Sequence, residues 1–213
     1  MSFELENKLQ DWVSSQRIDK AIEYAESKLR SLPKSGFNKI LGKNILHHKE
    51  ELARFVDNFY SKSIKDYRKL NPNFIKRLFS KDSEAPKTLK SLSCEMASYS
   101  ISDTCNFNLF ALSKDEGLEQ LDWLADFEFN SLDDFEISGL EELVEVYLTY
   151  YDEEQYDDQF LESSWETCEY LLTLRLQELF QETVQILRTR NIIWDSLPIY
   201  IFAHDSDLTY RTI

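Results

Sequence analysis

Three observations along the chain predict an α+β fold. Apolar residues recur at intervals of three and four over most of the first 80 residues, as is typical of amphipathic helices. Residues 89–112 are instead rich in Ser, Thr, Asn and aromatic residues with partial period-two alternation, which favours strands. A helical spacing returns over 161–187 and is followed by a short apolar run. The alternative is an all-α fold, in which residues 89–112 are irregular.

The N-terminal part is expected to consist of helices. The apolar spacing over residues 5–29 predicts an amphipathic helix that Pro33 and Gly36 end. A second helix is expected over about 44–70, and a short third one over 74–79.

The middle of the chain predicts a small antiparallel sheet. Residues 89–112 are interpreted as a hairpin, two strands around a turn near Asp103. Short helices are expected over 118–124 and 139–148, and the segment between them, 128–138, is interpreted as loop or edge strand.

The C-terminal part predicts a long helix and a final strand. Apolar residues keep a helical spacing for most of seven turns over 161–187. Leu197–Ala203 is a short run of apolar residues, as expected of a buried strand, and Pro198 stands at its start, where a missing N–H is tolerated.

Charge is distributed very unevenly along the 213 residues. We expect one domain, 1–213, with a basic helical part over 1–80 and an acidic α+β part over 89–213. Residues 1–90 carry a formal charge of +7 and the remainder −22, which gives the net charge of −15. Residues 115–174 contain 20 Asp or Glu and no Lys, Arg or His. This charge disfavours nucleic acid and anionic membranes as partners and favours a basic protein.

Cysteine and glycine usage bears on compartment and chemistry. Cys94, Cys105 and Cys168 lack the spacing of a metal site or a redox pair, which predicts free thiols and a cytoplasmic location. No run of 18 apolar residues is present, so a membrane span is not expected. With four glycines and no phosphate-binding loop, the sequence predicts no cofactor and gives no support for an enzyme.

The candidate partner-binding residues lie inside the acidic window. The tyrosines are interpreted as partly exposed because acids surround them, and exposed tyrosine within a carboxylate rim has the composition of a binding hot spot. These residues are Tyr150, Tyr151, Asp152, Glu153, Glu154, Tyr156, Asp157 and Asp158.

The segment "TYYDEEQYDD", residues 149–158, resembles the binding face of bacterial immunity proteins against nuclease toxins, in which paired tyrosines are flanked by acids. The resemblance implies a cytosolic protein that binds and neutralises a basic toxin. Two alternatives remain: an accessory domain whose acidic face only keeps it dissolved, and a metal-assisted hydrolase using Asp205 and Asp207 beside His204. For these last three residues, the preferred interpretation is a polar turn after the final strand.

Overall fold

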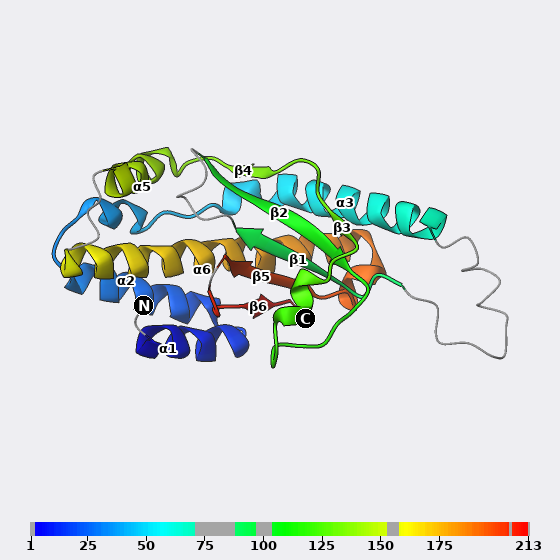
Figure 1. The fold of residues 1–213 in the computed structure, drawn as a ribbon, viewed down its shortest axis with the longest axis horizontal. Coiled ribbons are helices and arrows are strands. Elements are labelled where there is room, and N and C mark those ends of the chain that lie inside the picture. Colours follow the sequence, from blue (N-terminus) through cyan, green and yellow to red (C-terminus); the bar gives the residue numbers. More distant parts are fainter. Residues whose placement is uncertain (1–2, 71–87, 97–103, 153–157, 205, 213) are drawn as a thin grey trace.

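The fold combines helices with a mixed sheet and is α+β, as the sequence predicts (Figure 1). The computed structural model describes residues 3–70, 88–96, 104–152, 158–204 and 206–212. The helices are α1 (Phe3–Ser14), α2 (Ile18–Ser31), α3 (Lys49–Leu70), α5 (Glu141–Asp152) and α6 (Gln159–Arg190). Short 3₁₀ turns are η1 (Gly36–Ile40), η2 (Leu46–His48), η3 (Asp122–Ala125) and η5 (Ile192–Asp195). The strands are β1 (Ser91–Met96), β2 (Cys105–Leu112), β3 (Phe129–Asn130), β4 (Phe135–Ile137), β5 (Ile199–Ala203) and β6 (Tyr210–Arg211).

The expected antiparallel pair is present, but the sheet as a whole is mixed. β1 and β2 pair antiparallel, and Cys94 lies opposite Leu109. β5 then pairs with β1 in the parallel direction, with Leu92 opposite Ile199, and β6 follows on its far side. A parallel neighbour needs a crossover connection, and the segment containing α5 and α6 supplies it. β3 and β4 both pair with β2 on its outer edge, so 128–138 contributes edge strands.

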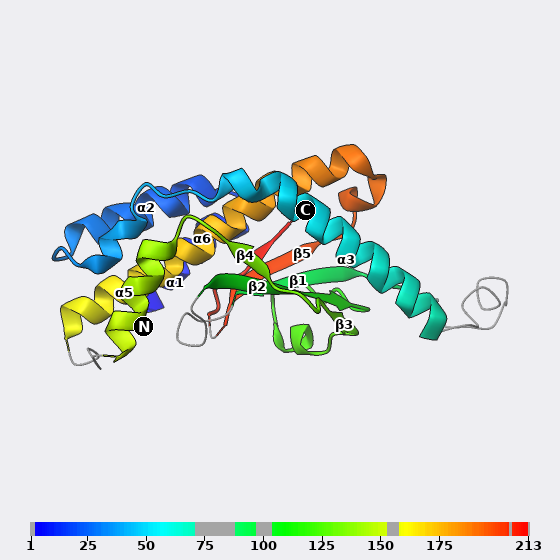
Figure 2. The same cartoon turned by 90° about the horizontal axis from the view of Figure 1, so that it is seen from above.

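The helices cover one face of this sheet (Figure 2). Alternate residues of β1, namely Leu92, Cys94 and Met96, point into the same hydrophobic core as α6. That core includes residues from Leu5 to Tyr210, so side chains from the basic and the acidic parts pack together. The opposite face is partly covered by the segment that contains η3, where Trp123 and Tyr200 belong to a second, smaller cluster.

The N-terminal helix is broken where the sequence predicts continuity. α1 ends at Ser14 and α2 begins at Ile18, because Gln16 adopts a left-handed conformation with φ of 61°. The N–H of Arg17 then donates to the carbonyl of Trp12 at 2.8 Å, which closes the helix end. The break lets both helices place an apolar face on the core.

Two other expected helices differ from the structure. The helix expected over 118–124 is only the 3₁₀ turn η3, and the one expected over 74–79 lies outside the described residues. The long helix over 161–187 and the final strand are confirmed. No helix in the described part of the chain is long and apolar enough to cross a bilayer.

Candidate functional site

Tyr150 is a core residue, which corrects the expectation that it is exposed. Only 4% of its surface is accessible. Its ring lies edge-on to Phe37 of η1 at 5.5 Å and stacks on Trp165 of α6 at 6.0 Å, measured between ring centroids. α5 presents Tyr150 inward because Leu143, Tyr147 and Tyr150 share one face of the helix, and all three are buried.

Of the other residues of the expected tyrosine site, the structure describes Tyr151, Asp152 and Asp158. Tyr151 is partly buried and Asp152 is exposed at the end of α5. Asp158 is the N-cap of α6, and its Oδ1 accepts hydrogen bonds from the backbone N–H groups of Phe160 and Leu161, at 2.9 and 3.1 Å. Glu153, Glu154, Tyr156 and Asp157 lie outside the described residues.

His204, in the turn after β5, is paired with a carboxylate. His204 Nδ1 lies 2.6 Å from Glu95 Oε1 of β1. The backbone N–H of Asp207 donates to Glu6 Oε1 at 3.1 Å, whereas Asp205 is not among the described residues. Within the described ranges, no group of three or more His, Cys, Asp or Glu side chains is placed to hold a metal ion.

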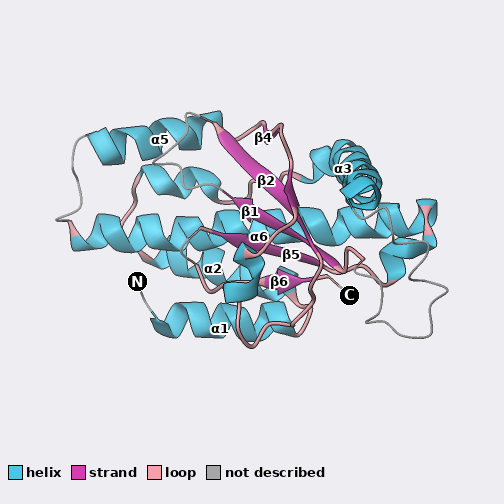
Figure 3. Ribbon diagram, turned by 45° about the vertical axis from the view of Figure 1, so that its right-hand side comes forward, coloured by secondary structure: helices cyan, strands magenta, loops and turns pink. Residues whose placement is uncertain are grey.

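A different group of acids lines a groove at the edge of the sheet, which we call the acidic groove. It lies between α3, β4 and α5, which stand in that order along the edge of β2 (Figure 3), and its volume is about 850 Å³. Its carboxylates are Glu51, Asp133, Asp134, Glu136, Glu141 and Glu145. His48 also lines it, and the described lining residues include no Lys or Arg.

The apolar floor of the acidic groove comes from the same elements. Phe135 of β4 lies 5.4 Å from Phe55 of α3 between ring centroids, and Val144 and Leu148 of α5 line the groove beside them. Because β4 alternates, Phe135 and Ile137 face the core while Glu136 between them is exposed.

His48, the last residue of η2, links one end of β4 to the start of α3. The backbone N–H of Ser138 donates to His48 Nε2 at 3.1 Å, and His48 Nδ1 lies 3.5 Å from Glu51 Oε2. The acceptor role of Nε2 places the ring proton of the neutral form on Nδ1, toward Glu51. Gly139 follows with φ of 91°, a left-handed conformation that suits glycine, and the chain turns into α5.

The carboxylates of the acidic groove are largely without compensating charge. Asp133, Asp134, Glu136 and Glu145 form no ion pair with any described residue. Glu141 accepts a hydrogen bond from the backbone N–H of Gly139 at 2.7 Å, and this bond lowers the pKa of its carboxyl below the usual value. The acidic groove is therefore a concave, negative surface with an apolar floor.

Sequence reasoning missed this site although a signal for it exists. Residues 133–137 read "DDFEI", an alternation of acids with two apolar residues that is typical of a half-exposed edge strand. The neighbouring walls come from residues about 80 positions earlier and 10 later, and only the fold brings them together.

The tyrosines have a structural role in this site. Tyr147 lies 5.2 Å from Phe37 between ring centroids, and Tyr150 packs on Trp165, so the inner face of α5 is held against η1 and α6. The outer face of the same helix carries Glu141 and Glu145 into the acidic groove.

Comparison of the chain with protein-family models, with curated proteins and with solved structures finds no match.

Proposed function

We propose that this protein binds a basic protein partner through the acidic groove and neutralises it by covering the surface that the partner needs. The observation that carries the proposal is the lining of the groove, with six carboxylates and no Lys or Arg among its described residues. Its volume of about 850 Å³ admits several Lys or Arg side chains of one partner segment.

Electrostatics supports this function in two ways. The net charge of −15 steers a cationic partner toward the protein and raises the association rate. The carboxylates around the groove then orient the bound partner, while Phe55, Phe135 and Leu148 offer apolar surface that the partner can bury. A charged rim around an apolar floor is the arrangement found in specific protein interfaces.

The proposed partner is a cytoplasmic basic protein, with a nuclease toxin as the candidate. The complementarity of charge supports a basic partner, and the toxin is a candidate only through the sequence resemblance over residues 149–158, in which Tyr150 is buried. The burial of Tyr150 moves the proposed contact from residues 150–158 to the acidic groove.

The test compares two variants that lose the same charge. One carries Asp133→Asn, Asp134→Asn and Glu136→Gln in the acidic groove. The other carries Glu116→Gln, Glu119→Gln and Glu182→Gln at exposed positions that do not line it. Each is used to capture, and then titrate, the basic partner at about 50 mM and about 300 mM salt, between which screening increases strongly.

We expect the groove variant to bind about 10-fold more weakly than the wild type, and the control variant to bind within about 3-fold of it, since each partly exposed pair contributes on the order of 0.2–1 kcal/mol. Wild-type binding should weaken at the higher salt concentration. Equal losses in both variants would show that only the overall charge matters, and would refute the groove as the contact site.

A further inference from the structure

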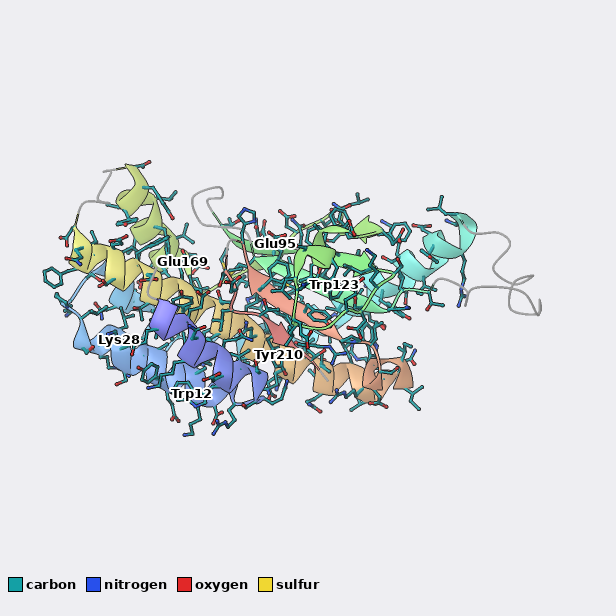
Figure 4. The ribbon with its side chains drawn as sticks, turned by 60° about the horizontal axis from the view of Figure 1, so that its bottom comes forward. Trp12, Lys28, Glu95, Trp123, Glu169 and Tyr210 are labelled. Carbon is teal, nitrogen blue, oxygen red and sulfur yellow. The ribbon has the colours of Figure 1, made fainter. Side chains whose placement is uncertain are left out.

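A second hollow, which we call the open-face groove, lies on the face of the sheet opposite to α6. It has a volume of about 650 Å³. Its floor is formed by β1, β2 and β5, and one wall by the segment that contains η3. Figure 4 shows Glu95 of β1 and Trp123 of η3 on this side of the molecule. None of the residues that line the acidic groove lines this one.

The open-face groove is hollow because a small residue stands between large ones. Ser93 of β1 is opposite Phe110 of β2 and Tyr200 of β5, so one hydroxymethyl group lies between two aromatic side chains across the sheet. Ser93 is 1% exposed, and its Oγ has no hydrogen-bond partner among the described residues. A buried hydroxyl without a partner is unfavourable, and a ligand that supplies a donor or acceptor removes that penalty.

The walls of the open-face groove are aromatic. The rings of Phe110 and Phe127 lie 4.8 Å apart between centroids, and Phe202 of β5 lines the floor. Phe127 is 46% exposed, so part of its ring is open to a ligand in the groove. An apolar ligand body would cover it.

The rim of the open-face groove is negative. Glu95, Asp122 and Asp207 line it, and its described lining residues include no Lys, Arg or His. Glu95 is paired with His204, whereas Asp122 and Asp207 form no ion pair within the described ranges. Two carboxylates are therefore available to a positive charge.

We propose that the open-face groove binds a small organic cation, a primary amine attached to an apolar or aromatic body. An ammonium group has three N–H donors, so it can pair with a carboxylate and donate to the Ser93 hydroxyl at the same time. The apolar body would then pack against Phe110, Phe127 and Phe202, where burial of apolar surface stabilises it. A volume of about 650 Å³ is in the range of small-molecule sites.

The test titrates the full chain with phenethylamine and, in parallel, with 2-phenylethanol, which has the same ring and spacer without the charge. Binding is followed through the backbone amide signals by two-dimensional NMR. We expect the amine to bind at least about 5-fold more tightly than the alcohol, as one charge-assisted contact would give. The largest signal changes should fall on residues of β1, β2 and the η3 segment.

Variants distinguish binding of the amine in the open-face groove from attraction by the overall negative charge of the protein. In Asp122→Asn with Asp207→Asn, affinity for the amine should fall to that for the alcohol, which itself should not change. Ser93→Ala removes the unpartnered hydroxyl without adding volume, so the protein should stay folded and bind the amine about 3-fold more weakly. Asp133→Asn with Asp134→Asn in the acidic groove is the matched control and should have no effect.

Three outcomes would overturn the proposal: equal affinity of the wild type for amine and alcohol, equal losses in the double variant and its control, or signal changes centred on the acidic groove. The last two would assign amine binding to the overall charge or to the other groove. Because the two grooves share no lining residue, failure here leaves the proposed protein partner untouched.

Discussion

Tyr150 shows how strongly the environment of one residue depends on helix geometry. Five acids follow it within eight positions, which favours a solvent-exposed interpretation. Yet Leu143, Tyr147 and Tyr150 stand at i, i+4 and i+7, the spacing of one helix face, and that face is buried. The periodicity of the apolar residues was the better guide here than the composition around them.

Replacing Tyr150 with alanine should therefore destabilise the protein. The change leaves a cavity between Phe37 and Trp165, and we expect a loss of about 3 kcal/mol or more in the free energy of unfolding. Asp152→Ala, two residues further and exposed, should change it by less than about 0.5 kcal/mol. Urea unfolding measures both, and a Tyr150→Ala protein as stable as Asp152→Ala would contradict the burial.

Glu169 should make the stability depend on pH. It lies on α6, its Oε1 is inaccessible to solvent, and burial raises the pKa of its carboxyl to about 7, although the nearby Tyr147 hydroxyl acts in the opposite direction (Figure 4). The folded protein thus keeps a proton that the unfolded chain loses near the ordinary carboxyl pKa of 4.5. The contribution of the Glu169 carboxyl to the free energy of unfolding is therefore fully present below pH 4.5 and is lost as the pH rises through about 7.

The measurement compares the wild type with Glu169→Gln between pH 5 and pH 8. The free energy of unfolding of the wild type, relative to the variant, should fall by on the order of 3 kcal/mol over the full interval between the two pKa values, and by somewhat less in the accessible window. A difference that stays constant across this range would show that Glu169 ionises normally in the folded state.

At the scale of elements, the long helices and strands could be predicted from the sequence more readily than the short ones. The 32-residue α6 and the β1–β2 pair were predicted because many residues repeat a period of 3.6 or 2. β3 and β6 have two residues each, too few to show a period. The break at Gln16 was not predictable because neither Gly nor Pro marks it.

Strand pairing was less predictable than the strands themselves. β5 was expected from its apolar run, but its parallel partner β1 lies about 100 residues earlier, with Ile199 opposite Leu92. No local pattern specifies such a contact, since many strands with the same alternation would fit the core equally well. The acidic groove was missed for the same reason, because its walls come from α3, β4 and α5.

The start of α6 provides a prediction at this scale. Asp158→Ala removes the side chain that accepts from two backbone N–H groups of the first turn, and should lower the free energy of unfolding by about 1 kcal/mol. Asp158→Asn keeps an acceptor while it removes the charge, so most of the stability should return. Thermal and urea unfolding distinguish the two variants, and an equal loss in both would point to charge instead of capping.

For the whole molecule, the uneven charge has a cost in stability. Twenty acids in a 60-residue window, without a cation between them, repel one another in the folded state. A few ion pairs join the acidic part to the N-terminal part, among them Arg175 with Glu26 and Arg190 with Glu50. Asp133, Asp134, Glu136 and Glu145 of the acidic groove form no ion pair with any described residue.

Removing those acids should accordingly stabilise the isolated protein. We expect Asp133→Asn, Asp134→Asn and Glu136→Gln together to raise the free energy of unfolding by about 1 kcal/mol at low salt, with a smaller gain at high salt because screening weakens the repulsion. Urea unfolding at two salt concentrations tests this. A loss of stability would mean that these carboxylates form favourable contacts within the fold.

The position of β5 inside the sheet, next to the edge strand β6, also affects how the protein is made. β5 lies between β1 and β6, so one edge of β1 has no strand to pair with until β5 is synthesised about 100 residues later. At translation speeds of roughly 5–20 residues per second, this edge stays open for several seconds on the ribosome. During that time the unpaired N–H and C=O groups of this edge are a template for pairing with other nascent chains.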